Sequence, residues 1–208
     1  QVLRDLPREG GWPLALAVIA AATMTYGYLA ALVQTNLVRL IAYSSVAQSG
    51  YFVMGVVALG VSGFAVPGIL VFAAAYVAMN LGAFAIVLLA GRDLDDLEGF
   101  GRSHPWLGAA MVVFLLSLTG IPPLFGFVGK FYLLLAAVEA GFLWLAIIGI
   151  LNSVLALGVY LRLVVPMYRE LKPSSTRGRV DPLTLVAILL ALFATTFMGL
   201  AAGILPGP

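Results

Sequence analysis

A lone lysine inside the longest apolar segment is the residue of this chain best suited to carry chemistry. Lys130 lies within residues 106–138, and the pair Pro122-Pro123 begins eight residues before it. A lysine at the centre of a membrane helix costs roughly 2.5–3.5 kcal/mol on insertion scales, and removal from water disfavours its ammonium relative to its neutral amine. A group that can hold two charge states, beside a helix interrupted by prolines, is suited to pass protons. We therefore predict that Lys130 takes part in proton transfer.

Further polar side chains fall within the apolar segments, several of them at helical spacing. Ser44, Gln48 and Tyr51 are spaced i, i+4 and i+7, which places them on one face of a helix. Such a face serves either to hydrogen-bond a neighbouring helix or to hold water molecules. The residues predicted to extend a polar axis from Lys130 are Gln48, Tyr51, Asn80, Ser117, Tyr160, Arg162 and Glu139.

Three of these candidates also have a simple structural interpretation. Asn80 lies in the middle of its apolar segment, where an amide commonly hydrogen-bonds a neighbouring helix. Arg162 stands near the end of its segment, where a long side chain can snorkel to the interface. Glu139 precedes Gly141 and is expected at the outer surface, either as an ordinary surface acid or at a proton exit.

The composition requires a lipid environment. Of the 208 residues, 62% are hydrophobic and only 10% are charged, whereas soluble domains carry about 25% charged residues. The chain has no cysteine, which excludes disulfides and iron–sulfur clusters bound by it, and its single histidine, His104, argues against a histidine-based metal or haem site. The net charge is +2 and the basic residues fall in connecting loops, so nucleic acid is not an expected partner.

Six apolar segments predict six transmembrane helices in a single transmembrane domain covering residues 1–208. Most segments are near the roughly 20 residues that span a bilayer. The fourth has 33 residues, which as a straight helix would measure about 50 Å against a hydrocarbon core of about 30 Å. Because glycines and prolines cluster in it, we predict a break around residues 120–129. The segments are residues 12–34, 40–60, 67–90, 106–138, 141–167 and 182–205.

The distribution of basic residues predicts the orientation. Six spans place both termini on one side of the membrane. That side holds two basic residues, Arg4 and Arg8, whereas the other side holds seven. The positive-inside rule assigns the richer side to the cytoplasm, so both termini are expected outside, in the periplasm of a bacterium. The sequence begins with Gln1 and shows no signal peptide before its first apolar segment, as in a fragment or a processed chain. The seven residues are Arg39, Arg92, Arg102, Arg169, Lys172, Arg177 and Arg179.

Four sequence motifs, in order along the chain, resemble the antiporter-like membrane subunits of respiratory complex I. They read RLIAYSSVAQSGY, AYVAMNLGAF, LSLTGIPPLFGFVGKF and LNSVLALGVYLRLVVPMY. The form YxxMNxGAF and the lysine in GFxGKF favour the N-type paralogue, since the M-type carries a glutamate there. The resemblance implies an all-α polytopic membrane fold, of which this chain covers the second five-helix inverted repeat and the final helix. Lys130 then matches a lysine of the broken helix near the proton exit.

Two departures from the family pattern concern the second apolar segment. Val38 stands before Arg39 where family members often have a basic residue, and Gln48 stands where a histidine is common. Both departures argue against a titrating role for this segment, although Gln48 can still hydrogen-bond a water chain. The first repeat of the family, with its own acidic and basic relay residues, is absent from this sequence.

The function that the resemblance implies is that of a proton-translocating subunit of membrane NADH:quinone oxidoreductase. Redox energy would come from partner subunits, which are expected to hold the FMN, the iron–sulfur clusters and the quinone, while this chain holds no cofactor. The expected partners are the other membrane subunits of complex I and the lipid of a bacterial inner membrane. Two alternatives stay open: a subunit of a multi-subunit cation/proton antiporter, and a structural membrane module in which Lys130 snorkels and nothing is transported.

Overall fold

The computed structural model describes residues 11–170 and 181–204, and the regular structure within them is helical. One isolated β-bridge joins Asn36 to Asp93, and the described part has no strand besides it. The predicted all-α class is therefore confirmed. The elements are α1 (Trp12–Leu32), α2 (Leu37–Val57), α3 (Ala65–Ala90), the 3-10 helix η2 (Leu94–Leu97), α4 (Phe100–Ser103), α5 (Pro105–Thr119), α6 (Phe125–Glu139), α7 (Leu143–Met167) and α8 (Pro182–Ile204).

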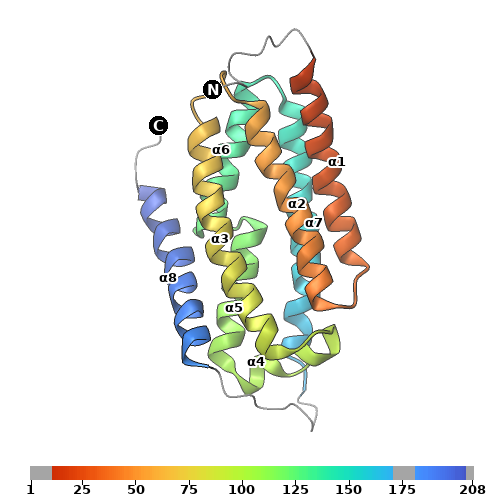
Figure 1. The fold of residues 1–208 in the computed structure, drawn as a ribbon, viewed down its shortest axis with the longest axis vertical. Coiled ribbons are helices and arrows are strands. Elements are labelled where there is room, and N and C mark those ends of the chain that lie inside the picture. The colour runs from red at the N-terminus through yellow and green to blue at the C-terminus, as the bar shows by residue number, and fades with distance from the viewer. Residues whose placement is uncertain (1–10, 171–180, 205–208) are drawn as a thin grey trace.

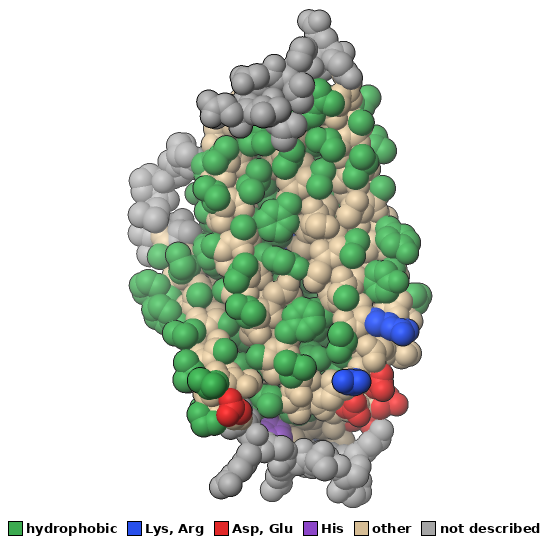
Figure 2. All heavy atoms as spheres, in the orientation of Figure 1, with side chains coloured by type: hydrophobic (Ala, Val, Ile, Leu, Met, Phe, Trp, Pro, Cys, Tyr) green, Lys and Arg blue, Asp and Glu red, His purple; other side chains and the backbone are tan. Residues whose placement is uncertain are grey.

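Within the described ranges, five helices are long and apolar enough to cross a membrane: α1, α2, α3, α7 and α8. Helix α1 begins, and α8 ends, at the same end of the bundle (Figure 1). On the face shown in Figure 2, hydrophobic side chains cover the middle of the molecule, and the coloured charged side chains gather near the opposite end. Part of the basic-residue pattern lies outside the described residues, namely Arg4, Arg8, Lys172, Arg177 and Arg179.

The fourth apolar segment consists of two helices, α5 and α6, each of 15 residues. Gly120 ends α5 with φ +91°, a left-handed conformation that glycine adopts readily. Pro122 and Pro123 follow, joined by a cis peptide bond, and neither residue is placed in a helix. Because the segment is interrupted near the middle of the bundle (Figure 1), the predicted break is confirmed.

The break is shorter than the predicted range of residues 120–129, because Gly126 and Gly129 lie inside α6. These glycines serve close packing. A Cβ added at Gly129 would lie 2.6 Å from Cα of Phe72 on α3, and one added at Gly126 would collide with the backbone oxygen of Ser117 on α5. The sequence cluster of glycines thus combines one residue that ends a helix with two that let α6 approach its neighbours.

The other helices pack around the break but leave Pro122 and Pro123 exposed. Helix α1 packs along α2, α7 lies against α1, and α3 packs between α6 and α8. Helix α8 approaches the break directly, since a Cβ added at Gly199 would lie 2.5 Å from the backbone oxygen of Pro123. The core they form includes three large polar-tipped side chains, Tyr28, Tyr51 and Tyr160, all of them buried. The fold therefore brings hydroxyl groups as well as aliphatic side chains to the centre of the bundle.

Candidate functional site

The centre of the candidate site is Lys130, whose side chain is 2% exposed. Its Nζ donates hydrogen bonds to the backbone oxygens of Leu118 at 2.8 Å and Thr119 at 3.2 Å. The last carbonyls of a helix have no intrahelical N–H partner, and they carry the negative end of the helix dipole. The break exposes these carbonyls at the end of α5. Lys130 lies on α6, the helix that follows the break, and its amine therefore caps the end of α5.

An aromatic ring covers another side of the same amine. The Nζ of Lys130 lies 4.3 Å from the centroid of the Tyr51 ring, a distance at which a cation–π interaction forms. The Tyr51 hydroxyl donates to the backbone oxygen of Gly149 at 2.7 Å and lies 3.1 Å from Oγ of Ser153. Helix α7 thus fixes the ring that α2 places beside Lys130. No ion pair with a carboxylate is found for Lys130 among the residues that the structure describes.

A set of hydrogen bonds leads away from the lysine through α2 and α7. Nε2 of Gln48 donates at 2.9 Å to the backbone oxygen of Leu118, which is the oxygen that Lys130 also uses, and lies 3.5 Å from the Tyr160 hydroxyl. That hydroxyl is 2.5 Å from Oγ of Ser44. We refer to Lys130, the Leu118 carbonyl, Gln48, Tyr160 and Ser44 as the buried polar chain. It joins residues that are up to 116 positions apart in the sequence.

One buried oxygen of this chain, Oε1 of Gln48, has no hydrogen-bond partner within the described ranges, and the buried hydroxyl of Tyr28 is a hydrogen-bonding neighbour of Tyr160. Buried polar atoms are normally paired with protein or with ordered water. The unpaired oxygen of Gln48 is therefore the place in this chain where water would be bound most readily. Tyr28 was not predicted from the sequence, although a tyrosine within an apolar segment is a signal that could have found it.

Ser117 lies at the break but makes contacts of another kind. Its Oγ donates to the sulfur of Met79 at 3.3 Å and accepts from the backbone N–H of Gly126 at 3.0 Å. The serine thus joins the last turn of α5 to the first turn of α6 and to α3. It does not hydrogen-bond Lys130, and its contribution in the structure is to hold the two half-helices in register.

The remaining predicted residues lie apart from the buried polar chain. Arg162 donates to backbone oxygens at the end of α1, those of Leu32, Ala31 and Gln34, the last at 3.0 Å. Glu139, at the far end of α6, accepts a hydrogen bond from Oγ of Ser62 at 2.5 Å. The side-chain amide of half-buried Asn80 makes no hydrogen bond in the described part of the chain. The part of any of the three in transport stays a prediction.

The site defines a class of protein: a polytopic helical membrane protein whose central helix is interrupted and capped from within by a lysine. The chain belongs to the family described as NADH:quinone oxidoreductase/Mrp antiporter, transmembrane, whose model matches residues 3–156. The resemblance predicted from the four motifs is therefore confirmed.

The chain is similar to curated relatives that are named NADH-quinone oxidoreductase subunit N. It is 43% identical over 195 residues to that of Bdellovibrio bacteriovorus, covering 89% of this chain and 40% of the relative. It is 44% identical over 163 residues to that of Rhodospirillum rubrum, covering 76% of this chain and 33% of the relative. The chain thus spans well under half the length of these relatives.

Solved structures share the fold. Respiratory complex I from Thermus thermophilus with bound aureothin contains a chain that matches with a TM-score of 0.81 and 31% identity, over 92% of this chain and 44% of that one. The Mrp complex from Dietzia sp. DQ12-45-1b matches with a TM-score of 0.76 and 23% identity, over 93% of this chain and 45% of that one. The second likeness is one of fold alone.

Proposed function

We propose that this chain is part of a proton-translocating subunit of membrane NADH:quinone oxidoreductase, and that Lys130 gains and loses a proton during turnover. The observation that carries the proposal is the environment of Lys130. The amine is buried, it is held by two carbonyls of an interrupted helix, and no carboxylate neutralises it within the described residues. Membership of the family and likeness to relatives named subunit N support the assignment to this enzyme complex.

The contacts of Lys130 are compatible with both charge states. Two carbonyls accept hydrogen bonds from the amine, and a neutral amine has two N–H donors while an ammonium has three. Protonation can therefore change while the two contacts persist. A unit charge brought to 4 Å from the amine is worth about 4 kcal/mol at an effective dielectric of 20, which is enough to reverse the preferred state. Such a charge, moving in a partner subunit, would drive the cycle.

The buried polar chain supplies part of a route for the proton, because the Leu118 carbonyl and the Gln48 amide only position the groups on either side of them. Hydroxyl groups both donate and accept hydrogen bonds, so Tyr160 and Ser44 can relay a proton by exchanging partners. Gln48 does not titrate, but its amide orients the chain between the lysine and Tyr160. Water bound at the unpaired oxygen of Gln48 would complete the link that side chains leave open.

The interrupted helix supports the inference of protein partners. Pro122 and Pro123 are exposed in this chain, and non-helical backbone at membrane depth is tolerated only inside protein or beside a polar cavity. Further protein, from the rest of the subunit or from neighbouring membrane subunits, would cover this surface. The FMN, iron–sulfur clusters and quinone would belong to partner subunits. The basic end of the bundle would face the cytoplasm of a bacterium, with both chain ends outside.

The test is proton pumping by the assembled complex in liposomes, measured as protons moved per electron transferred. A Lys130→Ala variant should lower this ratio while NADH oxidation by the partner subunits continues. A matched variant, Arg102→Ala, removes an exposed basic residue outside the site and should leave the ratio unchanged. Full pumping per electron in Lys130→Ala would refute the role of Lys130.

The family description also includes Mrp antiporters, which keeps a cation/proton antiporter as the second candidate. Purification of the native assembly separates the two, because flavin and iron–sulfur partners are expected only for the oxidoreductase. The structural module is less well supported: a snorkelling lysine directs its amine to water, whereas Nζ of Lys130 is bound to carbonyls inside the bundle.

A further inference from the structure

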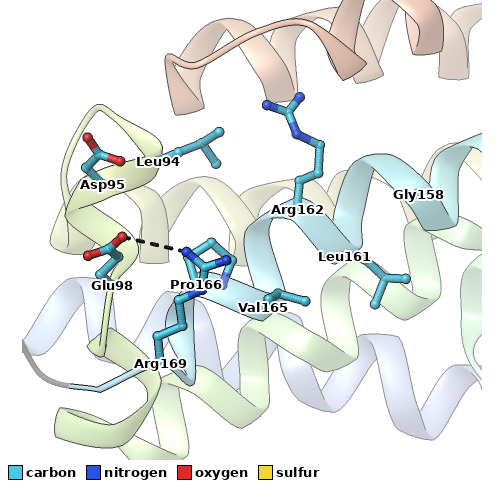
Figure 3. A pocket seen from close by; sticks show the side chains of 9 residues that line it. All are labelled: Leu94, Asp95, Glu98, Gly158, Leu161, Arg162, Val165, Pro166 and Arg169. Carbon is cyan, nitrogen blue, oxygen red and sulfur yellow. Dashed lines mark ion pairs between the residues drawn. The ribbon is translucent and has the colours of Figure 1, made fainter.

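A cavity of about 480 Å³ lies between η2 and the end of α7 (Figure 3), and no residue of the buried polar chain lines it. Its lining changes character along α7. The apolar part includes Gly158, Leu161 and Val165. Arg162 and Arg169 contribute two guanidinium groups, and Asp95 on η2 and Glu98 directly after it contribute two carboxylates. Figure 3 shows the order: Gly158 and Leu161 at one end, Arg162 next, and Asp95 beyond it.

The apolar part continues out of the cavity along the outer face of α7. Leu161 and Val165 are about half exposed, and so are Val154, Leu151 and Ile147 on the preceding turns. Gly158 has no side chain and leaves a gap in this row. The gap is open, because the nearest atom to an added Cβ would be Cδ2 of Leu32 at 4.0 Å. A helix face of this kind offers a hydrocarbon chain a continuous aliphatic surface with a shallow seat beside the cavity.

The two guanidinium groups have donors to spare. Arg162 uses three of its N–H groups on the carbonyls at the end of α1, and a guanidinium has five, so two are left. Arg169 is 62% exposed and lies 3.9 Å from Glu98, a weak surface pair that leaves its side chain free to reorient. Guanidinium groups bind phosphate through charge-assisted hydrogen bonds in fixed geometry.

The two acidic residues of the lining, Asp95 and Glu98, decide between classes of phosphate ligand. A purely anionic headgroup held by the arginines would be repelled by the exposed carboxylate of Asp95. A primary ammonium attached to the phosphate would instead donate hydrogen bonds to that carboxylate. From Gly158 toward η2 the lining is thus aliphatic, then cationic at Arg162, then acidic, with Arg169 beside Glu98 at the acidic end. This order complements an acyl chain, a phosphate and an amine.

We propose that this cavity binds an aminophospholipid of the phosphatidylethanolamine type. The phosphate lies between Arg162 and Arg169, the ammonium contacts Asp95, and one acyl chain follows the outer face of α7 past Gly158. The inference is independent of proton transfer at Lys130, because none of these residues belongs to the buried polar chain.

The test is photolabelling of the assembled complex in its membrane. Three phospholipid probes carry the same diazirine on the acyl chain and differ only in the headgroup: ethanolamine, choline or glycerol. Labelled peptides are then mapped by mass spectrometry. The ethanolamine probe should label residues 147–165 most strongly, because choline cannot donate a hydrogen bond and glycerol carries no positive charge.

Two variants at the surface of the cavity sharpen the test. Arg169→Gln should lower labelling of residues 147–165 about ten-fold, as expected for loss of a charge-assisted contact with phosphate. Its matched control, Arg102→Gln, removes an exposed arginine that does not line the cavity and should change nothing. Asp95→Lys should reverse the preference, so that the glycerol probe labels better than the ethanolamine probe.

Three results would overturn the proposal. Equal labelling by all three probes would show that the headgroup is not recognised. An unchanged preference in Asp95→Lys would show that the carboxylate does not meet the amine. Cross-linking of the cavity to another subunit, with no lipid label on residues 147–165, would show that protein occupies the site.

Discussion

Two basic side chains of this bundle perform the same backbone task in contrasting surroundings. Lys130 donates to the last carbonyls of α5, and Arg162 donates to those of α1. Each places a positive charge at the negative end of a helix dipole. Each also satisfies carbonyls that have no N–H partner within their own helix.

The two side chains differ in their surroundings and in their ability to release a proton. Lys130 is buried beside the ring of Tyr51, and it forms no ion pair with any described residue. It shares the Leu118 carbonyl with Gln48, which in turn contacts Tyr160. Arg162 lines a cavity with Asp95 at the charged end of the molecule. Lysine can release its proton, whereas arginine cannot. The same capping geometry thus places a titratable, enclosed cation at the end of α5 and a permanently charged one beside a cavity at the end of α1.

The largest effect should come from giving the side chain that caps α5 a permanent positive charge, as Arg162 has at α1. Lys130→Arg keeps a cation near the Leu118 carbonyl but removes the ability to deprotonate, so protons pumped per electron should fall more than about ten-fold. Pumping by the assembled complex in liposomes is the measurement. Arg162→Lys, the reciprocal change, should retain pumping. A Lys130→Arg complex that pumps as the wild type does would show that proton release from Lys130 is not required.

The next largest effect should come from filling the space at Gly126 that lets α6 lie against the end of α5. Gly126→Ala would force α6 away from the backbone of Ser117, and such overpacking costs about 1–3 kcal/mol. Less subunit should be found in the complex, as measured by its abundance after purification. Gly63→Ala is the matched control, because an added Cβ there meets nothing within 4 Å. Equal abundance of both variants would contradict the close packing at the break.

Removing the α1 cap should affect stability more than transport. Arg162→Ala leaves the carbonyls of Leu32 and Gln34 without their donor, and a hydrogen bond to a charged group is worth about 1.5–3 kcal/mol. The temperature at which the complex loses activity should fall. The ratio of protons to electrons in the surviving fraction should stay the same. A changed ratio at full stability would place Arg162 in the proton route instead.

The smallest effect should come from removing the hydrogen bond that holds the Tyr51 ring in place. Tyr51→Phe keeps the ring over Lys130 but removes the hydroxyl that bonds Gly149, a contact worth about 1 kcal/mol. Pumping should fall a few-fold at most, and Tyr51→Leu, which also removes the cation–π contact, should fall further. If both variants pump equally well, the ring makes no contribution to the state of the lysine.

Much of the fold was accessible from the sequence because its signals are local. Apolar segments of bilayer length predicted the long helices, and the excess length of residues 106–138 with Pro122 and Pro123 predicted the interruption. The i, i+4, i+7 spacing put Ser44, Gln48 and Tyr51 on one face, and α2 places all three in the interior. An isolated lysine in an apolar segment drew attention to Lys130 for the same reason.

The sequence alone therefore determined which residues are apolar, where the chain is interrupted and which side chain bears a charge at depth, since these follow from neighbours within a few turns. Only the tertiary structure decided that Lys130 meets the carbonyls of Leu118 and Thr119, that Gln48 shares one of them, and that Arg162 closes α1. Helical periodicity specifies the face on which a residue lies. The partner across that face depends on how helices distant in sequence pack, and no local pattern encodes it.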